Sequence, residues 1–76
     1  MVTPEQLKTW IETGFKNPQV SVDGDGHHFE AVIVAEEFEG KSRIQRHQLV
    51  YAALGDKMKA EVHALSMKTL TPAESE

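Results

Sequence analysis

A chain of 76 residues is long enough for one small domain and too short to enclose a large internal active-site cavity. It contains no cysteine, which excludes disulfide bonds, thiolate zinc sites and an iron–sulfur site with four cysteines of its own. Twelve acidic and eight basic side chains give a net charge of −4, which opposes general binding to nucleic acids. The longest apolar run spans residues 31–35 and the N-terminus lacks a signal-peptide pattern, so we expect a soluble, cytoplasmic protein with no membrane contact.

The first predicted element is a helix that begins after Thr3. A hydroxyl at Thr3, a proline at position 4 and Gln6 form a capping pattern. The apolar residues that follow at helical spacing are Leu7, Trp10, Ile11, Gly14 and Phe15. We expect this helix to continue until Asn17-Pro18, because the residue before a proline disfavours helical geometry.

A β-hairpin is predicted next. Val20 and Val22 alternate with polar residues, residues 24–26 supply a glycine-rich turn, and residues 29–35 are rich in β-formers. After a break at residues 36–40, Ser42 and Gln45 repeat the capping pattern. They predict a second helix that runs to residue 54 or slightly beyond.

The second helix is expected to bury one face and to weaken at its end. Residues that share the expected buried face are His47, Val50, Tyr51, Leu54 and Met58. Gly55 disfavours the last turn by roughly 1 kcal/mol relative to alanine. A third strand is predicted over residues 62–69, and Thr71-Pro72 closes the domain.

The order helix, strand, strand, helix, strand predicts a single α+β domain over residues 1–76. Its three-stranded sheet must cover one apolar face with both helices. We expect the ordered core to span about residues 3–72 and to be followed by a short polar tail.

Three segments of the chain resemble the BolA family, and the resemblance as a whole runs from about residue 7 to residue 74. They are the stretch over residues 38–54, the motif Val62-His-Ala-Leu65 and the motif Thr69-Leu-Thr-Pro-Ala-Glu74. The short arm over residues 20–26 resembles the compact IbaG-like branch. The resemblance implies a fold similar to the class II KH domain, with a short helical turn before the second long helix. Residues 39–42 would replace the KH glycine loop, but they lack its G-x-x-G pattern.

His63 is the principal candidate for a metal ligand. From the residues alone it is either a hydrogen-bonded core histidine or a histidine kept near the surface for chemistry. The resemblance favours the second interpretation, because the histidine of the BolA His-Ala-Leu motif is a ligand to a [2Fe-2S] cluster shared with a monothiol glutaredoxin and its glutathione. It implies a chain that is a monomer alone, binds no cluster by itself and forms a heterodimer with this partner.

His27 and His28 follow the predicted turn and are either solvated hairpin residues or a second metal ligand. The resemblance implies a histidine or cysteine ligand in this loop. His28, which precedes Phe29, fits the His-Phe strand start of the family, and either histidine is a candidate for the second ligand. Asp23 and Asp25 leave a hairpin zinc site open as a further interpretation, although aspartates in such positions usually serve the turn itself.

Lys41, Arg43 and Arg46 form a local basic patch at the start of the second helix. Three interpretations of these cations stay open. They form a solvated edge of the helix, they contact the phosphates of DNA, or they contact an acidic surface or the glutathione carboxylate on the glutaredoxin. We interpret His47 and Gly40 as structural.

The resemblance implies an adaptor for iron–sulfur cluster trafficking or for iron, redox or acid-stress regulation. The alternative is a DNA-binding transcriptional regulator that uses the KH-like face and the basic helix start. The sequence shows no nucleophile with a motif-bearing base, no phosphate-binding glycine loop and no H-E-x-x-H motif. We therefore expect that the chain is not an enzyme.

Overall fold

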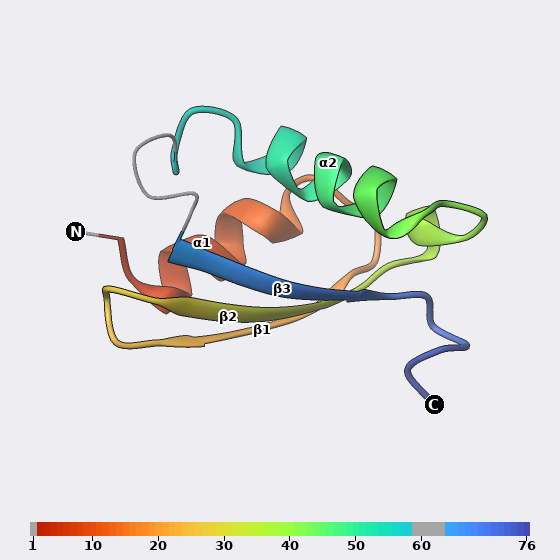
Figure 1. The fold of residues 1–76 in the computed structure, drawn as a ribbon, viewed down its shortest axis with the longest axis horizontal. Helices are drawn as coiled ribbons and strands as arrows, with labels where there is room; N and C mark the ends of the chain where they lie inside the picture. The colour runs from red at the N-terminus through yellow and green to blue at the C-terminus, as the bar shows by residue number, and fades with distance from the viewer. Residues whose placement is uncertain (1, 59–63) are drawn as a thin grey trace.

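The computed structural model describes residues 2–58 and 64–76. Its elements, in chain order, are α1 (Pro4–Glu12), β1 (Gln19–Gly24), β2 (Phe29–Val34), the 3-10 turn η1 (Glu36–Phe38), α2 (Arg43–Leu54) and β3 (Leu65–Leu70). Both helices lie on one face of the three-stranded sheet (Figure 1). The predicted α+β domain is confirmed, and so is the short helical turn before the second helix. Within the described part of the chain, no helix combines the length and the apolar character needed to cross a membrane.

β2 is the central strand of a mixed sheet. It pairs antiparallel with β1 and parallel with β3. The tight turn after β1 permits the antiparallel pair, whereas the parallel pair needs a long crossover, which carries α2. Phe29 is aligned with Gly24 on one side and with Leu65 on the other. The hairpin turn and the start of β3 therefore lie at the same end of the sheet (Figure 1).

The hydrophobic core lies between the sheet and the two helices. Its largest fully buried side chains are Phe29, Phe38, Leu7, Ile11, Ile33, Leu54, Met58 and Val50. Side chains of β2 alternate between the core and solvent, so Phe29 and Ile33 are buried while Glu30 is exposed. The ring of Phe38 in η1 extends the core and meets the ring of Phe15 edge-on, with centroids 5.3 Å apart.

Both helix starts follow the predicted capping pattern. The Thr3 hydroxyl accepts the N–H of Gln6, and the Ser42 hydroxyl accepts the N–H of Gln45. Each glutamine side chain in turn accepts the N–H of its cap residue, at 3.0 Å for Thr3 and 2.9 Å for Ser42. These reciprocal bonds satisfy amide groups that the helices leave without a partner.

The first helix is shorter than expected. α1 ends at Glu12, whereas the sequence indicated an end at Asn17-Pro18. The Thr13 hydroxyl donates to the carbonyl of Trp10 over 2.7 Å, a local bond that competes with regular helix geometry. Apolar spacing alone therefore overestimated the length of this helix.

The buried face of α2 is turned relative to the expected one. Val50 and Leu54 are buried, but Tyr51 is 41% exposed, so its predicted place on this face was wrong. A helix rotates by roughly 100° per residue, and this step carries Tyr51 away from a face centred on Val50 and Leu54. Met58 is buried, yet it follows Gly55, whose φ of +57° ends the helix. It reaches the core from the turn after α2.

The third strand starts later than predicted and ends one residue further on, because β3 spans Leu65–Leu70. Val62 and His63, which belong to the predicted strand, lie outside the described residues. Beyond β3, the segment expected to be a polar tail forms a turn in which the Ser75 N–H donates to the carbonyl of Thr71 over 3.1 Å.

Candidate functional site

The hairpin between β1 and β2 carries two histidines at one end of the sheet. The Asp25 Oδ1 atom accepts the backbone N–H groups of His27 over 2.8 Å and of His28 over 2.9 Å. Both residues are exposed. Because these hydrogen bonds to Asp25 hold the main chain of the turn, the two imidazole groups are presented by an organised turn.

The aspartates of this hairpin serve its turn chemistry. The pKa of Asp25 lies below its ordinary value because the N–H of His28, and then that of His27, stabilise the carboxylate. Asp23 accepts the N–H of the next residue, Gly24, over 3.0 Å. Within residues 2–58 and 64–76, no group of three or more histidine, aspartate or glutamate side chains is arranged to hold a metal ion. The described residues thus give the hairpin zinc interpretation no support.

The register of the sheet relates the hairpin to the start of β3. Phe29, directly after His28, is aligned with Leu65 at the first position of β3. His63 precedes Leu65 by two residues in the sequence and lies outside the described residues. Its ligand role therefore stays a prediction, as do those of His27 and His28.

A groove lies at the opposite end of the sheet, between the first turns of α2 and β3. It has a volume of about 470 Å³. Its lining residues are Lys41, Arg43, Arg46, His47, Met67, Lys68, Thr69, Leu70 and Glu74. The rise of roughly 3.3 Å per strand residue separates the two ends of β2 by roughly 17 Å. The structure therefore does not bring the basic patch together with the hairpin histidines.

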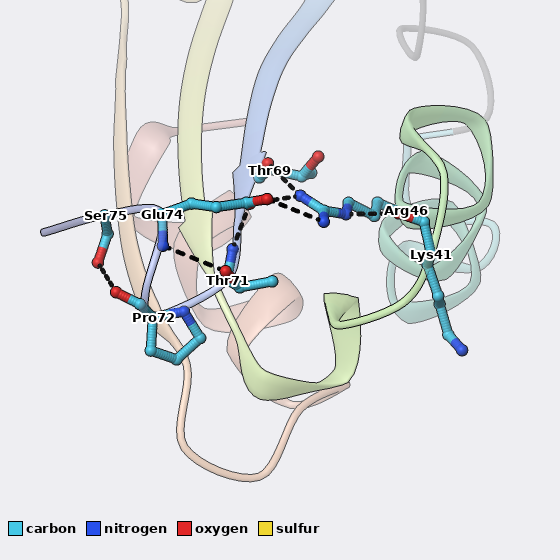
Figure 2. A network of polar contacts seen from close by, with 7 residues as sticks. All are labelled: Lys41, Arg46, Thr69, Thr71, Pro72, Glu74 and Ser75. Atoms are coloured by element: carbon cyan, nitrogen blue, oxygen red, sulfur yellow. Dashed lines mark hydrogen bonds and ion pairs between the residues drawn. The ribbon is translucent and has the colours of Figure 1, made fainter.

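Arg46 forms its hydrogen bonds with other residues of the chain, as Figure 2 shows. Its Nη1 atom donates to Glu74 Oε1 over 2.7 Å and its Nη2 atom to Glu74 Oε2 over 3.3 Å. Nη1 also donates to the carbonyl of Thr69 over 3.1 Å, and Nε donates to the carbonyl of Lys41 over 3.0 Å. The Arg46 side chain is only 14% exposed. Of the three cations predicted to contact a partner, this one has an intramolecular role that the sequence interpretation missed.

Glu74 closes the turn after β3 and was also missed. The Thr71 N–H donates to Glu74 Oε1 over 2.9 Å, and the Glu74 N–H donates to the Thr71 hydroxyl over 3.2 Å. Hydrogen bonding to Arg46, followed by that to Thr71, lowers the pKa of Glu74 to about 2. The signal was present in the sequence, because a threonine followed three residues later by a glutamate is the capping pattern already seen at Thr3 and Ser42.

The other residues of the basic end differ in exposure. Lys41 and Arg43 are exposed, and neither forms an ion pair with any described residue. His47 is half-buried, and its burial, followed by the charge of Arg43, lowers its pKa below the ordinary value. Gly40 has a φ of +76°, a left-handed conformation that favours glycine.

This architecture defines a class of compact α+β domains, in which two helices cover one face of a mixed sheet and a short helical turn precedes the second helix. Residues 2–74 match the family model described as BolA-like protein. The chain belongs to the BolA family, which confirms the resemblance inferred from its motifs.

Known relatives cover almost the whole chain. It is 44% identical over 70 residues to the acid stress protein IbaG of Escherichia coli, covering 91% of this chain and 83% of the relative. The structure of a bolA protein homologue from Coxiella burnetii is 54% identical with a TM-score of 0.87, covering 99% of this chain and 97% of that one. The BolA domain of SufE1 from Arabidopsis thaliana is 32% identical with a TM-score of 0.78, covering 93% of both chains. The chain spans about half the length of BolA-like protein 1 from cattle (52%) and human (51%).

Proposed function

We propose that this chain is a non-enzymatic adaptor that binds a monothiol glutaredoxin and shares a [2Fe-2S] cluster with it and with glutathione. The observation that supports this proposal most is the alignment of Phe29 with Leu65. Because of it, the exposed His27 and His28 lie at the end of the sheet where β3 begins. His63 belongs to the Val-His-Ala-Leu motif that leads into β3, and the BolA resemblance gives this histidine its ligand role.

The side chains that could bind iron in this chain are suited to a cluster shared with a partner. Neutral imidazole is an iron ligand in clusters where histidines replace cysteines on one iron. Since the chain has four histidines and no cysteine, the thiolate ligands would come from the glutaredoxin and glutathione. When bound, the cluster would supply a redox centre whose potential is raised by imidazole ligation. Imidazole must be unprotonated to bind iron, so the complex should be acid-labile.

Of the two hairpin histidines, we propose His28 as the second ligand. It directly precedes Phe29, whose main chain pairs with Leu65, while His27 is one residue further from the strand. The hydrogen bonds that both N–H groups donate to Asp25 fix the main chain at the two positions, so the exposed side chains supply the adjustable part of the site.

The proposed role is cluster trafficking or the regulation of iron, redox or acid stress in the cytoplasm, and the name of the relative IbaG supports the acid-stress class. The test is native mass spectrometry after anaerobic mixing with a monothiol glutaredoxin, glutathione, iron and sulfide. We expect a one-to-one heterodimer that carries two iron and two sulfide ions, with the isolated chain as a metal-free monomer. A cluster found only on the glutaredoxin would contradict the proposal.

DNA-binding regulation is the second candidate function. The exposed Lys41 and Arg43 beside the start of α2 favour it. The ion pair of Arg46 with Glu74 and the net charge of −4 weaken it, because they reduce the positive potential available to phosphates.

DNA binding is tested by measuring duplex affinity against salt concentration. The slope of log K against log salt should be about −0.9 for each phosphate that the protein neutralises. If DNA binding is a function, Arg43→Ala should make this slope shallower while Lys8→Ala, on the exposed side of α1, should not. An affinity that is independent of salt would exclude this function.

A further inference from the structure

The outer edge of β3 carries main-chain groups that the described sheet does not pair. The strand order is β1-β2-β3, so within the described residues β3 has a strand on one side only. The Leu70 carbonyl accepts the Ala35 N–H on the β2 side over 3.0 Å, whereas the Thr69 carbonyl accepts from Arg46 on the other side. Successive residues direct their main-chain groups to opposite edges, so Met67 presents its N–H and carbonyl on the same outer edge as Thr69.

This edge borders the groove of about 470 Å³ described above, and the groove has a positive balance of charge. Among the residues that the structure describes, Glu74 is the one carboxylate that lines the groove, and the two hydrogen bonds from Arg46 already neutralise it. Lys41, Arg43 and Lys68 also line the groove and form no ion pair among the described residues. In a chain with a net charge of −4, this local excess of cations is complementary to an acidic occupant.

We infer that the groove binds an acidic peptide in extended conformation, which adds to β3 as a fourth strand. Main-chain hydrogen bonds at Met67 would supply affinity, and the cations beside the edge would select acidic side chains. The bond from Arg46 occupies the Thr69 carbonyl, so the added strand ends near this position. The volume lies within the range of roughly 300–1,000 Å³ that is usual for ligand sites.

A peptide fits this edge better than a nucleic acid does. Residues 39–42 contain a single glycine and lack the paired glycines with which a KH domain clamps the nucleic-acid backbone. A short peptide also carries few charges, so the net negative charge of the chain repels it less than a polyphosphate. The groove lies at the opposite end of the sheet from the hairpin histidines, so the inference does not depend on the proposed cluster.

The test is an NMR titration of the full chain with a capped hexapeptide of alternating glutamate and valine. We expect slower amide hydrogen exchange at Met67 and at Thr69, the two outward-facing positions of β3 that line the groove. N-methylation of alternate peptide amides should weaken binding about tenfold, because it removes edge hydrogen bonds without changing charge. Replacing glutamate with lysine in the peptide should abolish binding.

Charge selection is tested with matched variants of the chain. Lys41→Gln and Arg43→Gln should each weaken peptide binding about two- to fivefold, whereas Lys8→Gln, which removes an exposed cation outside the groove, should leave it unchanged. Equal binding of the N-methylated peptide, or absence of protection at Met67, would overturn the inference. So would an oligothymidylate that protects the same amides and binds more tightly than the peptide.

Discussion

Arg46 donates a hydrogen bond to each carboxylate oxygen of Glu74, with nitrogen–oxygen distances of 2.7 and 3.3 Å. The two residues are 28 positions apart, and their contact ties the start of α2 to the turn after β3 (Figure 2). A planar guanidinium matches the two oxygens of a carboxylate, so the contact fixes direction as well as distance. The same carboxylate accepts the Thr71 N–H, and one side chain therefore both caps the turn and anchors it.

Glu74→Gln should lower the melting temperature. The amide keeps the size of the side chain but loses the charge-assisted bonds to Arg46. The matched control is Glu76→Gln, which removes the same charge from an exposed residue without an ion pair among the described residues. Thermal unfolding at neutral pH compares the two variants. Equal melting temperatures would show that the contact between Arg46 and Glu74 adds no stability.

The ion pair of Arg46 with Glu74 also predicts that the stability of the fold depends on pH. The pKa of Glu74 is about 2 in the folded chain against an ordinary value of 4.5, chiefly because of Arg46. A depressed carboxylate pKa stabilises the fold fully above pH 4.5, and this contribution is lost as the pH falls towards 2. The difference in melting temperature between wild type and Glu74→Gln should therefore shrink over this interval. A difference that stays constant across it would contradict the assignment.

Local signals in the sequence predicted much of the fold. Both capping boxes, the hairpin and the end of α2 depend on residues within a few positions of one another, and the structure confirms them. The exposure of Tyr51 was not predicted, because helical spacing gives the width of an apolar face but not its direction. The ion pair of Arg46 with Glu74 was missed for another reason. Arg46 was predicted to contact a partner, and it meets Glu74, 28 positions further on, only in the folded chain.

The candidate site was likewise predicted only in part from the sequence. The motif resemblance named His63 and the hairpin histidines without any distance between them. The structure adds the alignment of Phe29 with Leu65, which depends on a parallel pairing that no short motif encodes. It also separates the basic patch from the hairpin, because α2 begins at the other end of the sheet.

Gly14→Ala should destabilise the fold by about 1–3 kcal/mol, the usual cost of overpacking. A Cβ atom at this position would collide with the Cβ of Ala53 on α2. Ala53→Gly removes that atom at a helix-propensity cost of roughly 1 kcal/mol. In a double-mutant cycle followed by urea unfolding, the second substitution should therefore recover part of the loss caused by the first. Simple additivity of the two effects would argue against the collision.

Ser42→Ala should lower the free energy of unfolding by about 1 kcal/mol. The hydroxyl accepts the Gln45 N–H over 3.2 Å and is part of the reciprocal cap of α2. Ser42→Asn provides the control, since an asparagine side chain also accepts this bond. Urea unfolding of the three proteins should rank alanine below serine and asparagine. If asparagine lost as much stability as alanine, the cap would not explain the effect.

We propose His63 as the principal histidine ligand of the shared cluster. This claim is tested by anaerobic reconstitution with a monothiol glutaredoxin, glutathione, iron and sulfide, followed by visible circular dichroism. Wild type should give a spectrum that neither protein gives alone, and His63→Ala should lose or alter it. His47→Ala is the matched control, because His47 lines the groove at the far end of the sheet, and it should keep the spectrum. An unchanged spectrum in folded His63→Ala would contradict the claim.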